Sequence, residues 1–162
     1  MNTILAALSR DVRDNIELLN NGGCCVYAAL VGRVLENMGY EVRGCTSGWA
    51  SVSVNIDEVR PLIKNRKKRV QWRDMGVPFN HVMLEVKLNG KWWMYDSCEL
   101  VLSDSTNIFA HKHVLTGRFT IEELEWLSTR DNHWNPMFNR RQIPKLKRLI
   151  ASYLSIEQRK AA

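Results

Sequence analysis

The feature that most constrains the fold of this 162-residue chain is a β-hairpin predicted over residues 81–98. Asn89-Gly90 separates two runs of alternating apolar and polar residues. This dipeptide favours a two-residue type I′ turn, because both of its residues tolerate a positive φ. The turn fixes the register by counting, so that Leu84 faces Tyr95. We therefore expect two strands of an antiparallel sheet at this place.

The register assigns each side chain of the hairpin to one of two faces. Six apolar side chains share the face expected to contact the core: Val82, Leu84, Val86, Leu88, Trp93 and Tyr95. The other, non-core face carries His81, Met83, Glu85, Met94 and Asp96. Asp96 lies diagonally across the ladder from His81, within reach of the imidazole. His and Asp are common on solvated faces, so the pair by itself does not establish a site.

Composition places the chain among ordinary globular proteins. Hydrophobic residues make up 45% and charged residues 25%, and the length suits a single domain over residues 1–162. No apolar run approaches a membrane span, and the N-terminus lacks the pattern of a signal peptide. The four cysteines form no Cys-x-x-Cys pair, so we expect free thiols, no metal site and a cytoplasmic location.

The net charge of +6 is concentrated in two basic blocks, residues 60–73 and 140–160. Such blocks are commonly solvated loops or helix faces. They can also bind an acidic protein or nucleic acid through phosphate contacts and base stacking. In the first block the residues suited to an anionic partner are Arg66, Lys67, Lys68, Arg69 and Trp72.

Helical periodicity predicts a helix over residues 3–19 and another that begins at Cys24 and ends at Gly39. Strands are expected over 40–45 and 49–56. The C-terminal third is expected to be mostly helical, as an extension over about 104–162. It contains a capping box at Thr120 and Glu123, an irregular loop over 131–139 and a last helix that opens at Pro144.

Gly22-Gly23-Cys24 places a cysteine at the first turn of the most apolar helix. The backbone N–H groups and the positive end of a helix stabilise a thiolate there, and a neighbouring imidazolium lowers the pKa of the thiol further. The glycines are expected to leave room for a substrate backbone. The other interpretation is a buried structural cysteine. A Cys, a His and an orienting carboxylate are what nucleophilic acyl transfer requires.

Two blocks of the sequence resemble the transglutaminase-like superfamily, whose members have papain-like catalytic sites. The cysteine-helix motif, Gly-x-Cys-x-x-(Tyr/Phe)-Ala with a later Gly and Arg, is matched by Gly22, Cys24, Tyr27, Ala28, Gly39 and Arg43. The His-x-x-(Val/Leu)-Glu-Val…Gly-Lys-Trp…Asp block is matched by His81, Leu84, Glu85, Val86, Gly90, Lys91, Trp92 and Asp96. Arylamine N-acetyltransferases share the Cys-His-Asp order, but they are longer and separate their Gly-Gly from the Cys by one residue.

The resemblance, which covers residues 22–98, implies an α+β fold with a papain-like or transglutaminase-like core. N-terminal helices, with the nucleophile at a helix start, would pack on an antiparallel sheet, and the C-terminal helices would be additions. It implies that Cys24 is the nucleophile, His81 the general base and acid, and Asp96 the group that fixes the imidazole tautomer. Cys25 is the alternative nucleophile. No metal or organic cofactor is implied.

Some positions fit the resemblance less closely. No Gln or Trp donor for an oxyanion stands just before Cys24, so the candidates are its own N–H together with Asn20 or Asn21. Cys98 faces His81 in the register but lies beyond Asp96 and is not at a helix start. The remaining histidines, His111, His113 and His133, are expected at the surface.

The predicted function is thiol-dependent acyl transfer on an amide or peptide bond through a thioester. Water is the expected acceptor, which makes the protein a peptidase or amidase, whereas an amine acceptor would make it a transglutaminase-type enzyme. A small member from a bacterial cell or a phage-infected host is suspected. The alternative is a catalytically silent module of the same fold that binds nucleic acid or an acidic protein through the two basic blocks.

Overall fold

The computed structural model describes residues 1–17, 19, 23–49, 81–97, 101–102, 113–128 and 138–161. Within these residues the fold combines helices with an antiparallel sheet, as an α+β class requires. The helical elements are α1 (Asn2–Asn15), α2 (Cys24–Asn37), α5 (Ile121–Ser128), the 3₁₀ helix η4 (Arg140–Gln142) and α6 (Ile143–Ala161). The strands are β1 (Val42–Trp49), β2 (His81–Leu88), β3 (Lys91–Tyr95), β4 (Val101–Leu102) and β5 (His113–Phe119).

The sheet has the strand order β4-β3-β2-β1-β5, and all its pairs are antiparallel. The predicted hairpin is confirmed as β2 and β3. Asn89 and Gly90 both have positive φ, 51° and 78°, as a type I′ turn needs. The ladder pairs Leu84 with Tyr95, which is the predicted register.

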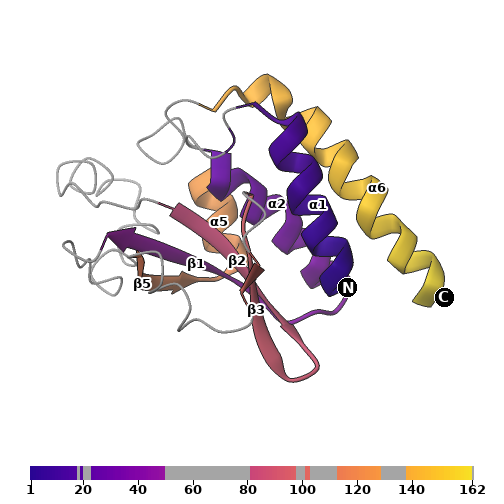
Figure 1. Cartoon of the computed structure of the whole chain (residues 1–162), viewed down its shortest axis with the longest axis horizontal. Coiled ribbons are helices and arrows are strands. Elements are labelled where there is room, and N and C mark those ends of the chain that lie inside the picture. The colour runs from indigo at the N-terminus through magenta and orange to yellow at the C-terminus, as the bar shows by residue number, and fades with distance from the viewer. Residues whose placement is uncertain are drawn as a thin grey trace.

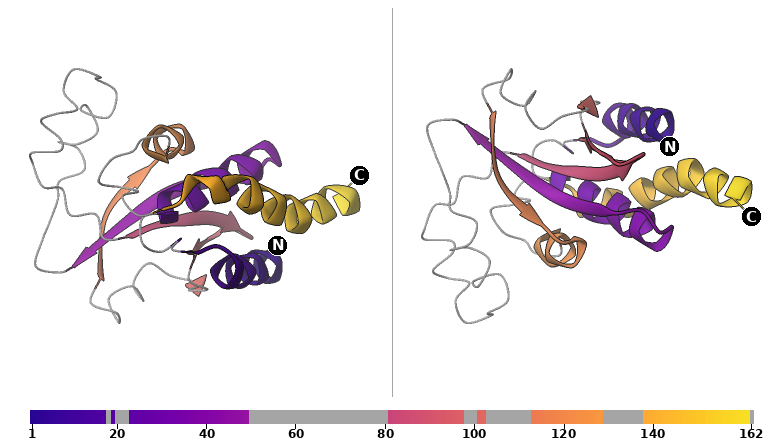
Figure 2. Two further views of the ribbon diagram at one scale, coloured as in Figure 1. Left: turned by 90° about the horizontal axis from the view of Figure 1, so that it is seen from above. Right: turned by 90° about the horizontal axis from the view of Figure 1, so that it is seen from below.

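One face of the sheet is covered by helices (Figure 1). α2 packs against β1 and β2, α5 lies beside α2, and α1 lies beside α6 and also contacts β3 (Figures 1 and 2). The close approach of α2 depends on Gly32. A Cβ on this residue would lie 2.5 Å from Ile121 of α5 and 3.0 Å from Leu84 of β2.

The predicted core face of the hairpin is confirmed, but the face that was expected to lie away from the core is also buried. Val82, Leu84, Val86 and Tyr95 belong to the main hydrophobic core, with Leu88 and Trp93 against it. On the other face, Met83 and Met94 form a second buried cluster with Cys45, and Glu85 is only 1% exposed. β2 is therefore buried on both faces.

Three expectations for the elements need correction. The helix predicted over 3–19 is α1, which ends at Asn15 because Ile16 adopts an extended backbone, although Ile16 and Leu19 are still buried. β1 continues through residues 46–48, where a break was expected, because both β2 and β5 pair with it there. The C-terminal third, which was expected to be mostly helical, also contributes strand β5.

The predicted helix boundaries with a local chemical cause are confirmed. Gly39 follows α2 with φ 87°. In the capping box, the N–H of Glu123 donates to Thr120 Oγ1 and the N–H of Thr120 donates to the Glu123 carboxylate. α6 begins at Ile143, one residue before Pro144. No helix in the described part of the chain has the length and hydropathy to cross a membrane.

Candidate active site

Cys24 is the first residue of α2, at the end of the helix that meets the start of β2. Its helix has no side-chain N-cap and no acidic residue in its first turn. The backbone N–H groups of Cys25 and Val82 hydrogen-bond to the Cys24 sulfur and favour its thiolate. The sulfur thus faces donors from a helix start and from a strand.

Gly23 does not leave the space for a substrate that the sequence suggested. A Cβ on Gly23 would lie 2.7 Å from both Leu19 and Phe138, which are core side chains. The glycine is needed for close internal contact behind the cysteine. Gly22 lies outside the described residues.

His81 and Asp96 lie in direct contact, as the hairpin register predicts. His81 Nε2 and Asp96 Oδ2 are 3.0 Å apart. The carboxylate is buried, with 4% of its side chain exposed, and the imidazole is 16% exposed. Because Nε2 is held by Asp96, Nδ1 is the ring nitrogen left for the thiol.

The electrostatics of this trio favour an ion pair between thiolate and imidazolium. Burial raises the pKa of Cys24, but the hydrogen bond and charge of His81 and the two backbone N–H groups outweigh it, so the pKa is lowered. Burial lowers the pKa of His81, but hydrogen bonds and charge from Asp96 and Cys24 outweigh it and raise the pKa to about 10. These contacts therefore favour the thiolate form of Cys24, which is the form that acts as a nucleophile in cysteine enzymes.

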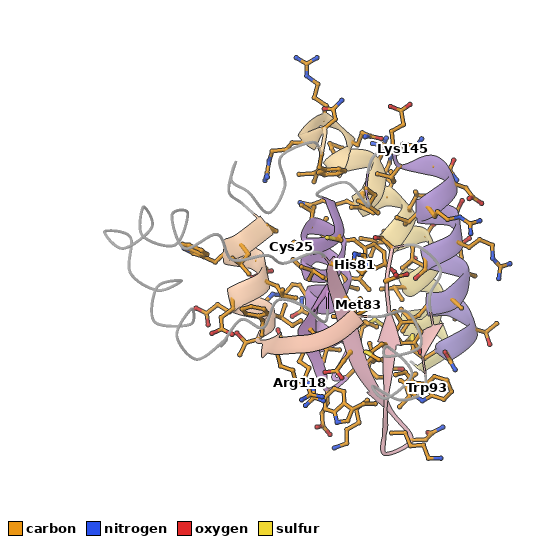
Figure 3. The ribbon with its side chains drawn as sticks, turned by 60° about the vertical axis from the view of Figure 1, so that its left-hand side comes forward. Cys25, His81, Met83, Trp93, Arg118 and Lys145 are labelled. Carbon is orange, nitrogen blue, oxygen red and sulfur yellow. The ribbon has the colours of Figure 1, made fainter. Side chains whose placement is uncertain are left out.

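Cys25, the alternative nucleophile, has a different environment. Its S–H donates to the carbonyl oxygen of Leu124 in α5, at 3.6 Å. Burial, and next the charge of Cys24, raises the pKa of Cys25 well above its usual value. Figure 3 labels Cys25 on α2 and His81 at the start of β2, and the contacts that favour a thiolate belong to Cys24.

Several predicted site residues lie outside the described part of the chain. These are the oxyanion candidates Asn20 and Asn21, the basic-block residues Arg66, Lys67, Lys68, Arg69 and Trp72, and also Cys98, His111 and His133. His113 begins β5, but its side chain is outside the description. Their roles stay predictions.

Sequence reasoning missed two features near the site. The first is the hydrogen bond from the N–H of Val82 to the Cys24 sulfur. A backbone donor can come from almost any residue type, so the sequence does not indicate it. The second is a charged cluster further along β2, where the carboxylate of Glu85 accepts from Arg43 and Arg118. Arg43 also lies over the ring of Trp92, 3.8 Å from its centroid. Arg43 and Glu85 face one another across β1 and β2, a register that no turn in the sequence fixes.

The second basic block forms η4 and α6, and two of its cations contact the protein itself. Arg140 donates to the carbonyl oxygen of Ser128 and Lys145 to that of Asn15. Lys147 and Arg148 are exposed on α6.

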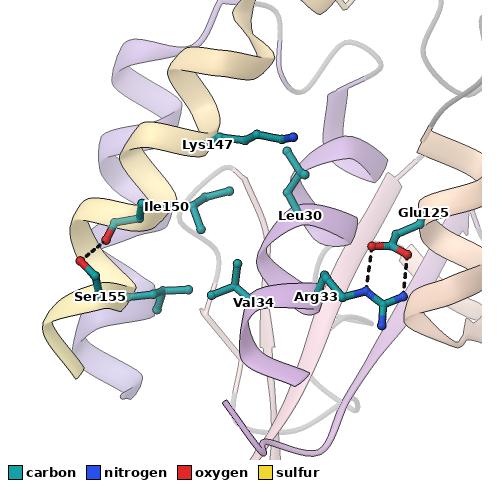
Figure 4. Close-up of a pocket in the computed structure, with 9 residues that line it drawn as sticks. Leu30, Arg33, Val34, Glu125, Lys147, Ile150 and Ser155 are labelled. Atoms are coloured by element: carbon teal, nitrogen blue, oxygen red, sulfur yellow. Dashed lines mark hydrogen bonds and ion pairs between the residues drawn. The ribbon is translucent and has the colours of Figure 1, made fainter. Parts of the chain in front are cut away.

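A cavity of about 470 Å³ lies away from the cysteine, between α2, α5 and α6 (Figure 4). Its walls include Leu30, Val34 and Ile150, and a two-bond ion pair between Arg33 and Glu125 closes one side. In the described residues, no group of three or more His, Cys, Asp or Glu side chains is arranged to hold a metal ion.

Comparisons with known proteins give no relative for this chain. No protein-family model, no curated protein and no solved structure matches it.

Proposed function

We propose that this protein is a cysteine-dependent acyl-transfer enzyme of the papain-like or transglutaminase-like kind, acting on an amide or peptide bond. The single observation that carries the proposal is the hydrogen-bonded series Cys24–His81–Asp96 at a helix start, in which the thiol pKa is lowered and the imidazole pKa is raised. The resemblance of the two sequence blocks supports the same roles for the same residues.

In the first half-reaction, the Cys24 thiolate attacks the carbonyl carbon of the amide. The C=O electron pair moves to oxygen, where N–H groups of the first turn of α2 can stabilise the oxyanion, since such groups lack partners within their own helix. The His81 imidazolium then donates its Nδ1 proton to the departing amine. The C–N bond breaks, and the acyl group remains on Cys24 as a thioester.

In the second half-reaction, neutral His81 removes a proton from the acceptor. The acceptor oxygen or nitrogen attacks the thioester, the C–S bond breaks, and the thiolate–imidazolium pair is restored. Asp96 stabilises the imidazolium in both half-reactions and keeps Nδ1 directed at the reacting atoms. Water as the acceptor gives hydrolysis, which is the outcome we propose.

Acyl-enzyme formation from p-nitrophenyl acetate tests the proposal without knowledge of the natural substrate. We expect a burst of p-nitrophenolate and one acetyl group on Cys24, located by peptide mass spectrometry. The Cys24→Ala variant should lose both signals, while Cys25→Ala should keep them. Acetylation spread over lysines, with an equal signal from Cys24→Ala, would overturn the proposal.

A further inference from the structure

Helix α1 reaches the neighbourhood of Cys24 through a buried hydrogen bond. Ser9 Oγ of α1 and Tyr27 Oη of α2 are 2.7 Å apart, and neither residue is exposed to solvent. Tyr27 follows Cys24 by three positions, so both lie on the same side of α2, one turn apart. Ser9 therefore holds the turn of the helix that directly supports the cysteine.

The same hydroxyl pair lies close to the carboxylate of the trio. Burial raises the pKa of Tyr27, the Ser9 hydrogen bond lowers it, and the negative charge of Asp96 raises it again. Tyr27 thus lies within the electrostatic field of Asp96, although it comes from a different element.

A second bond from α1 reaches the strand that carries Asp96. The hydroxyl of Tyr95 donates to Asn2 Oδ1 at 2.7 Å. Tyr95 directly precedes Asp96, and it is the last residue of β3. One helix therefore binds both partners of the site: α2 through Ser9 and β3 through Asn2.

We propose that α1 is a positioning element for the Cys24–His81–Asp96 trio, and that it acts through Ser9 and its partner Tyr27 of α2. The bonds Ser9–Tyr27 and Asn2–Tyr95 fix the start of α2 against the end of β3, and so set the position of the thiol relative to the Asp96 carboxylate that holds the imidazole. Neither residue touches the reacting atoms. This inference rests on the proposed role of Cys24 as the nucleophile.

The test is the rate of Cys24 alkylation by iodoacetamide at pH 6 in Ser9→Ala and Tyr27→Phe. Each variant removes one hydroxyl, and Tyr27→Phe keeps the shape of the ring. We expect each rate to fall about 5-fold, the equivalent of one neutral hydrogen bond. The double variant should fall no further than either single variant, because both remove the same bond. The pH at half-maximal rate should rise in all three.

Leu8→Ala is the matched control, because Leu8 is the fully buried neighbour of Ser9 on α1 and makes no polar contribution. It should lower the Tm more than Ser9→Ala does, yet leave the alkylation rate of the folded protein unchanged. Equal rates in Ser9→Ala, Tyr27→Phe and wild type would overturn the inference, as would a fall in Leu8→Ala of the same size. A wild-type Cys24 that does not react at pH 6 would instead overturn the proposed function.

Discussion

The two ends of α2 differ in how their backbone groups are capped. At the C-terminal end, the N–H of Gly39 donates to the carbonyl oxygen of Glu36, and the N–H of Tyr40 donates to that of Leu35. This is a Schellman motif, which satisfies the last carbonyl groups with backbone alone. At the N-terminal end, Gly23 offers no side-chain cap and the first turn has no acidic residue.

Because of this difference, the first N–H groups of α2 have no oxygen from a side-chain cap against them. A Ser, Asp or Asn at position 23 would place its own oxygen against the first N–H groups of α2. With glycine there, the positive end of the helix stays available to the Cys24 sulfur. The C-terminal end of α2 is therefore capped by backbone hydrogen bonds, and the N-terminal end carries the candidate site.

The largest change in the reactivity of Cys24, at the N-terminal end of α2, should come from His81→Ala. We expect alkylation of Cys24 at pH 6 to fall by roughly two orders of magnitude, because the burial that raises the thiol pKa would then act without an imidazolium to oppose it. Stopped-flow or mass-spectrometric rates at pH 6 measure this. A Cys25→Ala control should react like wild type. A rate for His81→Ala within a factor of about two of wild type would contradict the pairing.

Asp96→Asn should have a smaller effect of the same sign. The amide keeps the shape of the carboxylate but removes the charge that raises the pKa of His81, so we expect about a 10-fold slower alkylation at pH 6. NMR titration of His81 should show its pKa below that of the wild type, which is about 10. An unchanged pKa of His81 in Asp96→Asn would contradict the role of Asp96 in stabilising the imidazolium.

Alanine substitutions of Gly23 and Gly39 measure how much each end of α2 contributes to the free energy of unfolding. Gly23→Ala should lower the free energy of unfolding by about 1–3 kcal/mol, because the new Cβ meets Leu19 and Phe138 at 2.7 Å. Gly39→Ala should cost about 1–2 kcal/mol, because Gly39 has φ 87° and open space around it.

Urea denaturation measures both costs, and Cys24 alkylation should change only in Gly23→Ala. An equal change in the Cys24 alkylation rate in both variants would contradict the statement that only the N-terminal end of α2 affects the thiol.

The smallest effect concerns the pH dependence of stability. The folded-state pKa of Cys24 is lowered from 9.0, so its contribution is lost as the pH falls through that lowered value. The pKa of His81 is raised from 6.5 to about 10, so its contribution is lost as the pH rises through 10. Below pH 9.0, and above both 6.5 and the lowered pKa of Cys24, the folded and unfolded pairs each bind one proton, so the slopes cancel.

Wild type minus Cys24→Ala/His81→Ala should therefore give a stability difference that falls as the pH rises from 9.0 to about 10, where only the folded pair still binds a proton. The slope there should be at most about 1.4 kcal/mol per pH unit. Urea titrations at several pH values measure it. A difference that rises steadily through this range would contradict the ion pair.

The parts of the fold that sequence could predict have local causes. The Asn89-Gly90 turn fixes the hairpin register, and that register brings Asp96 to His81 without any knowledge of the rest of the chain. Gly39 and the Thr120–Glu123 box mark helix boundaries in the same way. The position of Cys24 at the start of α2 was predictable in the same way, because Gly22-Gly23 precedes the apolar helical pattern.

The missed parts depend on contacts between distant segments. β5 is held by pairing with β1, about seventy residues earlier, with a register shift between Thr46 and Ser47 that no pattern in its own sequence indicates. Burial of Met83 and Met94 on the second face requires the cluster with Cys45. The different environments of Cys24 and Cys25 arise because consecutive helix residues point in different directions, one toward His81 and the other toward Leu124.

The most direct test of the account is iodoacetamide labelling between pH 5 and 10, with the modified cysteine located by peptide mass spectrometry. The account predicts that Cys24 is labelled first, that its rate is already high at pH 6, and that Cys25 stays unlabelled in the folded protein. First labelling of Cys25, or labelling of Cys24 that begins only above pH 8, would contradict a thiolate held by His81 at the start of α2.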